Sequence, residues 1–325
     1  MKHNWKITII VLAMFLITQL IGLAVINFYL PEEKALPYGM EPPEEVVPMC
    51  EEITSISNIF SFEFLKCIWP FLLFIAFFTL VILLVFLLIN FKSVWIMRIW
   101  FFIIVILGLG ITLYALNKSL NLTYPLAIAS IIALVLAYFK VFRRNIIIHN
   151  LTELMIYPGI AAVFVSILSF WAVILLLIVM SIYDMWAVWH SGIMQKMAKF
   201  QINKVGVLGG FFLPFASKKT REKIKKLKLK YKGKEIPKSI AKKQKLKVEL
   251  AILGGGDIIY PIIAAGAFLK TFGSIYASLM IPLFAGIALT YLLLFSKKKK
   301  YYPAMPFITT GIFIGMIIGW LVFLI

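Results

Sequence analysis

The chain has 325 residues, of which 62% are hydrophobic and only 14% are charged. This composition excludes a soluble globular protein and is typical of a chain that crosses a membrane several times. The formal net charge of +19 is also found in nucleic-acid-binding proteins, but no binding module for nucleic acid can be recognised. In a membrane protein, lysine and arginine first determine the orientation in the bilayer.

Residues 1–190 contain six apolar segments that are long enough to cross a bilayer, which takes about 20 residues. The first has no signal-peptidase site after it, so we expect a retained helix rather than a cleaved signal peptide. Ser166 and Ser169 mark the expected break between the fifth and sixth helices. The six predicted helices span approximately residues 7–30, 68–91, 94–116, 122–142, 145–167 and 168–190.

Residues 191–247 form a predicted solvated, basic cytoplasmic loop, in which fifteen of the thirty residues from Lys218 to Lys247 are lysine or arginine. An apolar run from Val205 to Ala216 is too short to span a bilayer and predicts an interfacial or re-entrant piece. The residues from Lys226 to Lys232 alternate with period two. They predict either a strand or part of a disordered loop held near anionic lipid.

Residues 248–325 complete the chain with three further predicted helices, at approximately 248–269, 272–295 and 303–325. We therefore predict an all-α membrane protein of nine transmembrane helices. With the N-terminus in the cytoplasm, 29 of the 33 basic residues fall on the cytoplasmic side. Because basic residues concentrate on that side, we expect a cytoplasmic N-terminus and, after nine crossings, a C-terminus outside.

The chain has only two aspartates, Asp184 and Asp257, and each lies in an apolar segment. An ionised carboxylate is poorly solvated in hydrocarbon, so each predicts a functional site with the other as its partner. At about 1.5 Å per residue, Asp184 lies roughly 24 Å from the outer end of its predicted helix, and Asp257 roughly 14 Å from the inner end of its own. Both therefore fall in the inner half of a hydrocarbon core of about 30 Å, where they can meet.

Two neighbouring carboxylates in such a site cannot both ionise at low cost, so they share a proton. This arrangement predicts aspartic-protease chemistry. The ionised member takes a proton from the attacking water, and the protonated member hydrogen-bonds the peptide carbonyl. Gly254, Gly255 and Gly256 remove bulk beside Asp257, or serve helix packing alone. The residues leave open which aspartate takes which role.

Three short motifs resemble those of the presenilin and signal-peptide-peptidase (GxGD) intramembrane aspartyl proteases. They are Tyr183-Asp184, Gly254-Gly255-Gly256-Asp257 and Pro303-Ala304-Met305. The segment after Asp184 is most similar to the prokaryotic (archaeal) presenilin homologues, and the nine-helix plan extends the likeness over almost the whole chain.

The resemblance implies cleavage of transmembrane-helix substrates within a lipid bilayer, with Asp184 and Asp257 as the catalytic pair and with neither metal nor organic cofactor. It implies that substrates enter with their N-termini outside, and that a strand such as Lys226–Lys232 pairs with the unwound substrate. Activity of a single chain and of a homo-oligomer both remain open. The residues that the resemblance places beside the aspartates are Tyr183, Gly254, Gly256, Pro303, Ala304 and Met305. Met305 stands where the family has leucine, which has a similar volume.

A cation channel or transporter is the alternative, since intramembrane aspartates also form ion or proton relays. The nearly charge-free second, third, fourth and eighth helices and the absence of a visible inverted repeat argue against it. A structural scaffold would need neither aspartate.

Few other side chains in the sequence suggest a site. His149 and Glu153 share a helix face, but they are too few for a metal site, and the HExxH motif is absent. We expect Glu153 to be an interfacial or cavity-lining acid, because hydration costs little near a helix end. Cys50 and Cys67 fit neither a zinc site nor a CxxC pair, although they can pair with each other on an oxidising outer side.

Overall fold

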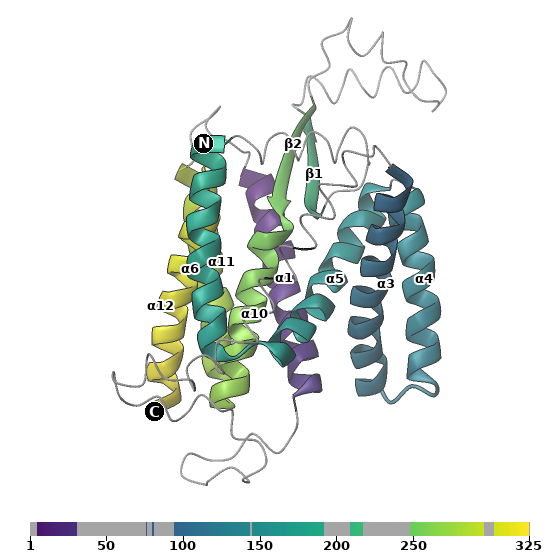
Figure 1. Ribbon diagram of the computed structural model, residues 1–325, viewed down its shortest axis with the longest axis horizontal. Helices are drawn as coiled ribbons and strands as arrows, with labels where there is room; N and C mark the ends of the chain where they lie inside the picture. Colours follow the sequence, from purple (N-terminus) through teal and green to yellow (C-terminus); the bar gives the residue numbers. More distant parts are fainter. Residues whose placement is uncertain are drawn as a thin grey trace, which may run out of the picture.

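The computed structural model describes residues 5–30, 76, 80, 94–143, 145–191, 209–216, 248–295 and 302–324. These residues form a helical body with a two-stranded sheet at one end (Figure 1). The predicted second helix, except Ala76 and Leu80, lies outside the described residues, as do both cysteines and Lys226–Lys232.

Eight α-helices make up the described body, and seven of them are long and apolar enough to cross a membrane. Helix α1 begins at the end of the body where the sheet lies, and α12 ends at the opposite end (Figure 1). The helices are α1 (Trp5–Tyr29), α3 (Val94–Ser119), α4 (Pro125–Phe142), α5 (Ile146–Ile167), α6 (Phe170–Trp186), α10 (Gly255–Phe272), α11 (Ile275–Phe295) and α12 (Met305–Leu324). The seven membrane-spanning candidates are all of these except α10.

Local signals explain where several helices begin and end. Pro125 opens α4, where the missing N–H of proline costs nothing. The Asn145 side chain caps α5 by accepting a hydrogen bond from Ile147 N at 2.9 Å. Ser169 caps α6 in the same way, which confirms the predicted break after the fifth helix. Gly273 ends α10 with a positive φ of 71°, which glycine adopts without strain.

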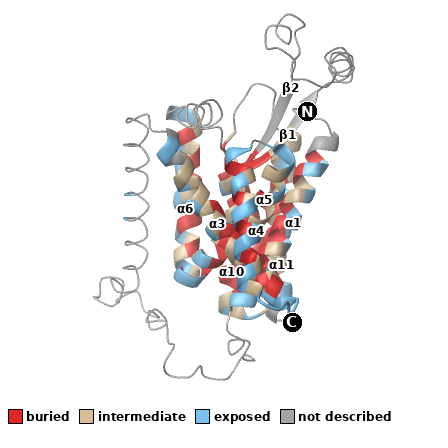
Figure 2. Cartoon of the chain, turned by 90° about the vertical axis from the view of Figure 1, so that its right-hand side faces the viewer, coloured by how far each residue is buried: buried red, intermediate tan, exposed pale blue. Residues whose placement is uncertain are grey.

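The helices pack around a centre formed by α1, α5 and α10, with α3 and α4 on one side and α6, α11 and α12 on the other (Figure 1). Buried residues run through the inside of the body, and the exposed ones line its outside (Figure 2). Many exposed residues are large and apolar, as a lipid-facing surface requires.

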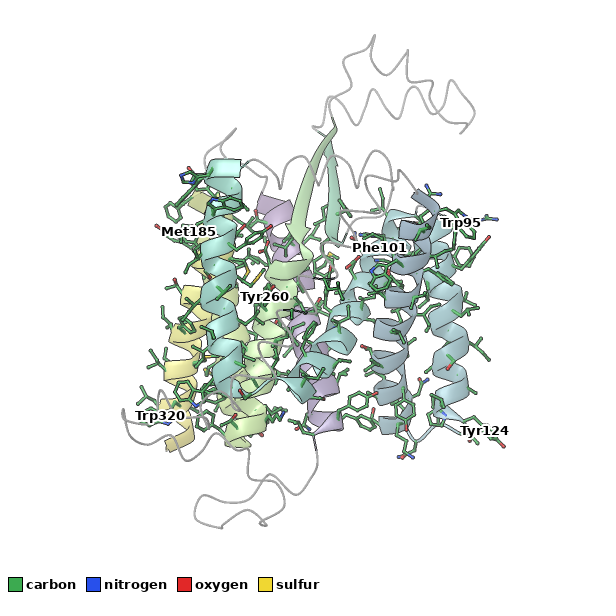
Figure 3. All side chains as sticks on the ribbon, viewed as in Figure 1. Trp95, Phe101, Tyr124, Met185, Tyr260 and Trp320 are labelled. Carbon is green, nitrogen blue, oxygen red and sulfur yellow. The ribbon has the colours of Figure 1, made fainter. Side chains whose placement is uncertain are left out.

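Exposed aromatic side chains mark both ends of the helical body. Trp95 lies at the sheet end and is 69% exposed, whereas Tyr124 and Trp320 lie at the other end and are 77% and 47% exposed (Figure 3). Tryptophan and tyrosine concentrate at the two membrane–water interfaces. Their placement supports a body that spans a bilayer between these two levels.

The sheet joins strands β1 (Gly210–Ala216) and β2 (Val248–Gly254), which pair antiparallel with Phe212 opposite Ile252. The predicted helix at 248–269 is therefore wrong over its first seven residues, and the all-α prediction needs this sheet added. Gly254 is the N-cap of α10, so the helix begins only at Gly255. Of the run Val205–Ala216, the part from Gly210 on forms β1.

Candidate active site

Asp184 lies in the last turn of α6 and is 5% exposed. The backbone N–H of Met305 donates to its Oδ2 at 3.0 Å, and the backbone N–H of Ala304 is a second partner. Met305 is the first residue of α12. Asp184 therefore satisfies N–H groups that the first turn of α12 cannot use itself, and the positive end of the helix dipole faces the carboxylate.

Asp257 is the third residue of α10, and Gly254 is the N-cap of that helix. The backbone N–H of Gly254 donates to the Asp257 carboxylate. This is the geometry of a capping box, in which an acidic side chain at the third position reaches back to the N-cap N–H. The predicted depth of Asp257 along a helix starting at 248 is thus wrong, because a strand precedes Asp257 and the helix has only begun.

The structure brings the two aspartates to one place. Helices α6, α10 and α12 contact one another, and the charge of Asp184 acts on Asp257. Met185, which follows Asp184, lies on the α6 side of the body, and Tyr260, one turn beyond Asp257, lies near its middle (Figure 3). Each carboxylate is held at the beginning of a helix, one by its own helix and one by α12.

The other residues of the three motifs play different parts. Pro303 and Met305 are buried beside Asp184, with Ala304 half-buried between them. Tyr183 is 49% exposed, and its ring centroid lies 6.3 Å from that of Trp186 on the surface of α6. The resemblance places Tyr183 with the substrate-positioning residues, and this stays a prediction.

Tyr157 on α5 is a site residue that the sequence did not reveal. It is 6% exposed, and a Cβ built on Gly255 would lie 2.6 Å from its hydroxyl oxygen. The absence of a side chain at Gly255 therefore lets Tyr157 reach the first turn of α10, two residues before Asp257. A lone tyrosine in an apolar helix carries no sequence signal for such a contact.

Gln19 on α1 contacts the backbone that follows Asp257. It is 1% exposed, and its Nε2 donates to the carbonyl of Ile258 at 2.8 Å. Ile258 follows Asp257 directly. Tyr157 thus packs against the backbone before Asp257, and Gln19 hydrogen-bonds the backbone after it.

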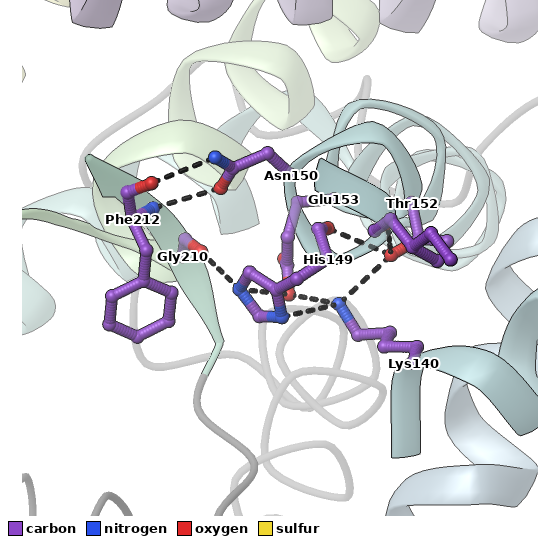
Figure 4. A network of polar contacts seen from close by, with 8 residues as sticks. Lys140, His149, Asn150, Thr152, Glu153, Gly210 and Phe212 are labelled. Carbon is purple, nitrogen blue, oxygen red and sulfur yellow. Dashed lines mark hydrogen bonds and ion pairs between the residues drawn. The ribbon is translucent and has the colours of Figure 1, made fainter. Parts of the chain in front are cut away.

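A cluster of polar side chains lies between α4, α5 and β1 (Figure 4). We call it the α5 polar cluster; its members are Lys140, His149, Asn150, Thr152 and Glu153. Lys140 and Glu153 form a buried ion pair, so the prediction of Glu153 as a hydrated interfacial acid is wrong. Helix α4 supplies a cation that the sequence could not locate. His149 and Glu153 do share a helix face as predicted, with His149 Nε2 at 3.6 Å from Glu153 Oε1.

Among the residues that the structure describes, no group of three or more histidine, cysteine or acidic side chains is placed to hold a metal ion. The α5 polar cluster contains a lysine ammonium beside its histidine and glutamate, which repels a cation.

Comparison with known proteins agrees with this architecture. Two solved structures of similar fold are both of a presenilin family intramembrane aspartate protease, one in space group C222 and one in P2. The first is 16% identical, with a TM-score of 0.56, over 98% of this chain and 100% of that chain. The second is 17% identical, with a TM-score of 0.55, over 96% of each chain. At these identities the likeness shows the fold alone.

The family is established by the sequence itself. No curated protein matches the chain. Residues 51–325, however, match the family model for signal-peptide peptidase, presenilin aspartyl protease. The matched range is well over half of the chain. The chain therefore belongs to the signal-peptide peptidase and presenilin family, and it is an integral membrane aspartic endopeptidase.

Proposed function

We propose that Asp184 and Asp257 are the catalytic pair that hydrolyses peptide bonds within transmembrane helices of membrane-protein substrates. One observation carries the proposal. The only two aspartates of the chain lie on contacting helices, and main-chain N–H groups at the beginning of a helix hold each carboxylate. Oriented carboxylates in a poorly solvated site are what the reaction needs.

In the proposed reaction, one carboxylate is ionised and the other carries a proton. The ionised member takes a proton from a water molecule while the water oxygen bonds to the peptide carbonyl carbon. The protonated member donates to the carbonyl oxygen. When the tetrahedral intermediate collapses, the C–N bond breaks and a proton passes to the leaving amine. The products are a carboxyl and an amine terminus, and the pair again holds one proton.

The substrate helix has to unwind first, because each carbonyl within a helix is already hydrogen-bonded. An unwound peptide can add to the edge of a sheet through its main chain. Strand β2 runs directly into the turn that carries Asp257, so a peptide paired with β2 leads towards the aspartates. We therefore place substrate binding on β2, in addition to the predicted strand at Lys226–Lys232. The excess of basic residues on one side supports a cytoplasmic N-terminus. With that orientation, the family resemblance implies substrates with their N-termini outside.

The test is cleavage of a reporter transmembrane segment by the purified, reconstituted protein. Asp184→Asn and Asp257→Asn preserve shape and remove the titrating group, so each should lower the cleavage rate by at least about 100-fold. Asp184→Ala and Asp257→Ala should behave alike, and thermal unfolding checks that the variants fold. Cleavage that persists in any folded variant would refute the pair. Conduction of ions that depends on the aspartates, without cleavage, would support the relay instead.

A further inference from the structure

The outer edge of β1, the edge that faces away from β2, is covered by side chains of α5. Asn150 Nδ2 donates to the carbonyl of Phe212 at 2.8 Å, and Phe212 N donates to Asn150 Oδ1 at 2.9 Å (Figure 4). One side-chain amide thus makes both of the hydrogen bonds that a neighbouring strand would make with Phe212. Nothing in the reaction described above uses Asn150.

His149 continues this contact along the same edge. Its Nε2 lies 2.9 Å from the carbonyl of Gly210, two residues before Phe212. Its Nδ1 lies 3.5 Å from Lys140 Nζ, which is a donor, so Nδ1 is the acceptor. The hydrogen is therefore on Nε2, which donates to the carbonyl of Gly210. Pro214, two residues after Phe212, has no N–H to present. The backbone groups of Gly210, Phe212 and Pro214 face the same edge, because alternate residues of a strand do so. His149, Asn150 and the proline ring therefore close that edge of β1.

The support behind the two side chains is rigid. Lys140 pairs with Glu153 and contacts Thr152 Oγ1 at 3.3 Å, which ties α4 to α5 immediately beneath His149. The His149 ring also packs on Phe212, with 4.9 Å between ring centroids. Buried and mutually bonded groups of this kind hold one geometry.

The other edge of the sheet is different. The backbone N–H and C=O of Phe212 point away from β2, so those of its partner Ile252 point away from β1. The same holds for Leu250, which lies opposite Pro214. In the described part of the chain, no hydrogen bond joins the backbone of Leu250 or Ile252 to an element on that side. Gly254, next in the alternation, donates to the carboxylate of Asp257. Among the described residues this edge of the sheet is therefore open, and it ends at Asp257 of the proposed catalytic pair.

We infer that Asn150 and His149 form a strand clamp, a pair of positioning residues that closes the edge of β1, fixes the sheet on α5 and leaves β2 as the edge for the substrate. An open strand edge accepts any extended chain, so closing one edge makes the binding position unique. The expected effect of the strand clamp on cleavage rests on the proposed function. The clamp itself is a property of the sheet and can be measured without substrate.

The experiment compares the reconstituted wild type with Asn150→Leu, which keeps the size of the side chain and removes both hydrogen bonds. Asn150→Asp is a second variant, because it retains an acceptor for Phe212 N and loses the donor to its carbonyl. Asn117→Leu is the matched control, since Asn117 is a buried asparagine that bonds Pro125 O at 3.3 Å, away from the sheet. Two quantities are measured: hydrogen exchange of the backbone amides in 210–216, and the positions of cleavage by mass spectrometry.

In Asn150→Leu, amide exchange in 210–216 should rise on the order of ten-fold, because two hydrogen bonds are lost. The ratio of cleavage products should shift between neighbouring peptide bonds, because the sheet no longer has one position. Asn117→Leu should leave both quantities as in the wild type. A lower rate with an unchanged product ratio and unchanged exchange, in folded Asn150→Leu and Asn150→Asp, would overturn the clamp. If the wild type cleaves nothing, the proposed function fails, and exchange alone decides the clamp.

Discussion

The N–H of Met305 donates to Oδ2 of Asp184 across 3.0 Å, so the Pro303-Ala304-Met305 motif meets the aspartate through its main chain. The side chain of Met305 instead packs in the core and is 4% exposed. This division separates two properties of one residue: the N–H orients Asp184, and the thioether fills space.

Substitutions of Met305 should separate these two properties. Met305→Leu keeps both the N–H and the volume, so cleavage should stay near the wild-type rate. Met305→Pro removes the N–H at a position where the helix tolerates proline, and kcat/KM should fall about ten-fold below that of Met305→Ala. Met305→Ala is the control for loss of the side chain. Equal rates for the proline and alanine variants would mean that the hydrogen bond does not orient Asp184.

Gly255 and Gly256 should respond oppositely to alanine. A Cβ on Gly255 would lie 2.6 Å from the Tyr157 hydroxyl, whereas a Cβ on Gly256 would meet only the Tyr260 ring at an ordinary 3.4 Å. Gly255→Ala should lower stability by about 1–3 kcal/mol and reduce cleavage. Gly256→Ala should leave the free energy of unfolding unchanged or raise it slightly, because alanine restricts the unfolded chain.

Adding Tyr157→Phe to Gly255→Ala removes the atom nearest to the new methyl group. Part of the lost stability and cleavage should return in this double variant. Thermal unfolding and reporter cleavage measure both effects. No recovery, with Tyr157→Phe alone folded and active, would place the cause elsewhere.

Ser181 and Thr309 join α6 to α12 one turn away from the Asp184–Met305 contact, with 2.7 Å between their hydroxyl oxygens. Hydrogen bonds between membrane helices are worth about 0.6 kcal/mol on average. A double-mutant cycle of Ser181→Ala and Thr309→Val should give a coupling free energy of that size in unfolding. Cleavage should fall in both single variants, because the hydrogen bond keeps the beginning of α12 at Asp184. A coupling of zero would show that packing alone sets this approach.

Removing one partner of the Lys140–Glu153 pair should destabilise the protein strongly, whereas replacing both with apolar residues should cost little stability. Glu153→Gln leaves the Lys140 charge buried without its partner, which should destabilise the protein by about 3 kcal/mol. The double variant Lys140→Met, Glu153→Leu removes both charges and should recover most of that loss. Lys118→Met, at an exposed lysine, should change stability by less than about 0.5 kcal/mol and serves as the control. Thermal unfolding in lipid measures all three. A double variant no more stable than Glu153→Gln would contradict this account.

The sequence was a good guide wherever the signal is local. Long apolar runs predicted the membrane helices, and Ser169 predicted the break before α6 because a cap acts on its own helix. The sequence misled at Val248–Gly254, because a short apolar run has no period that separates a buried strand from a helix. What decides for the strand is β1, a partner more than thirty residues earlier in the chain.

The two aspartates could be predicted because charge is rare in an apolar segment. Gln19, Asn150 and Tyr157 could not, since an uncharged polar residue in a membrane helix is common and its importance depends on what lies opposite. Glu153 shows the same limit: its depth follows from the sequence, but its burial depends on Lys140, which α4 brings against it.

Both aspartates are anchored by peptide N–H groups, which every residue except proline carries. At 254, 304 and 305 the contact with the aspartates therefore depends on side-chain size and on where a helix begins, rather than on side-chain chemistry. A substitution at these positions that keeps the N–H and fits the available space therefore leaves the two carboxylates held in the same way.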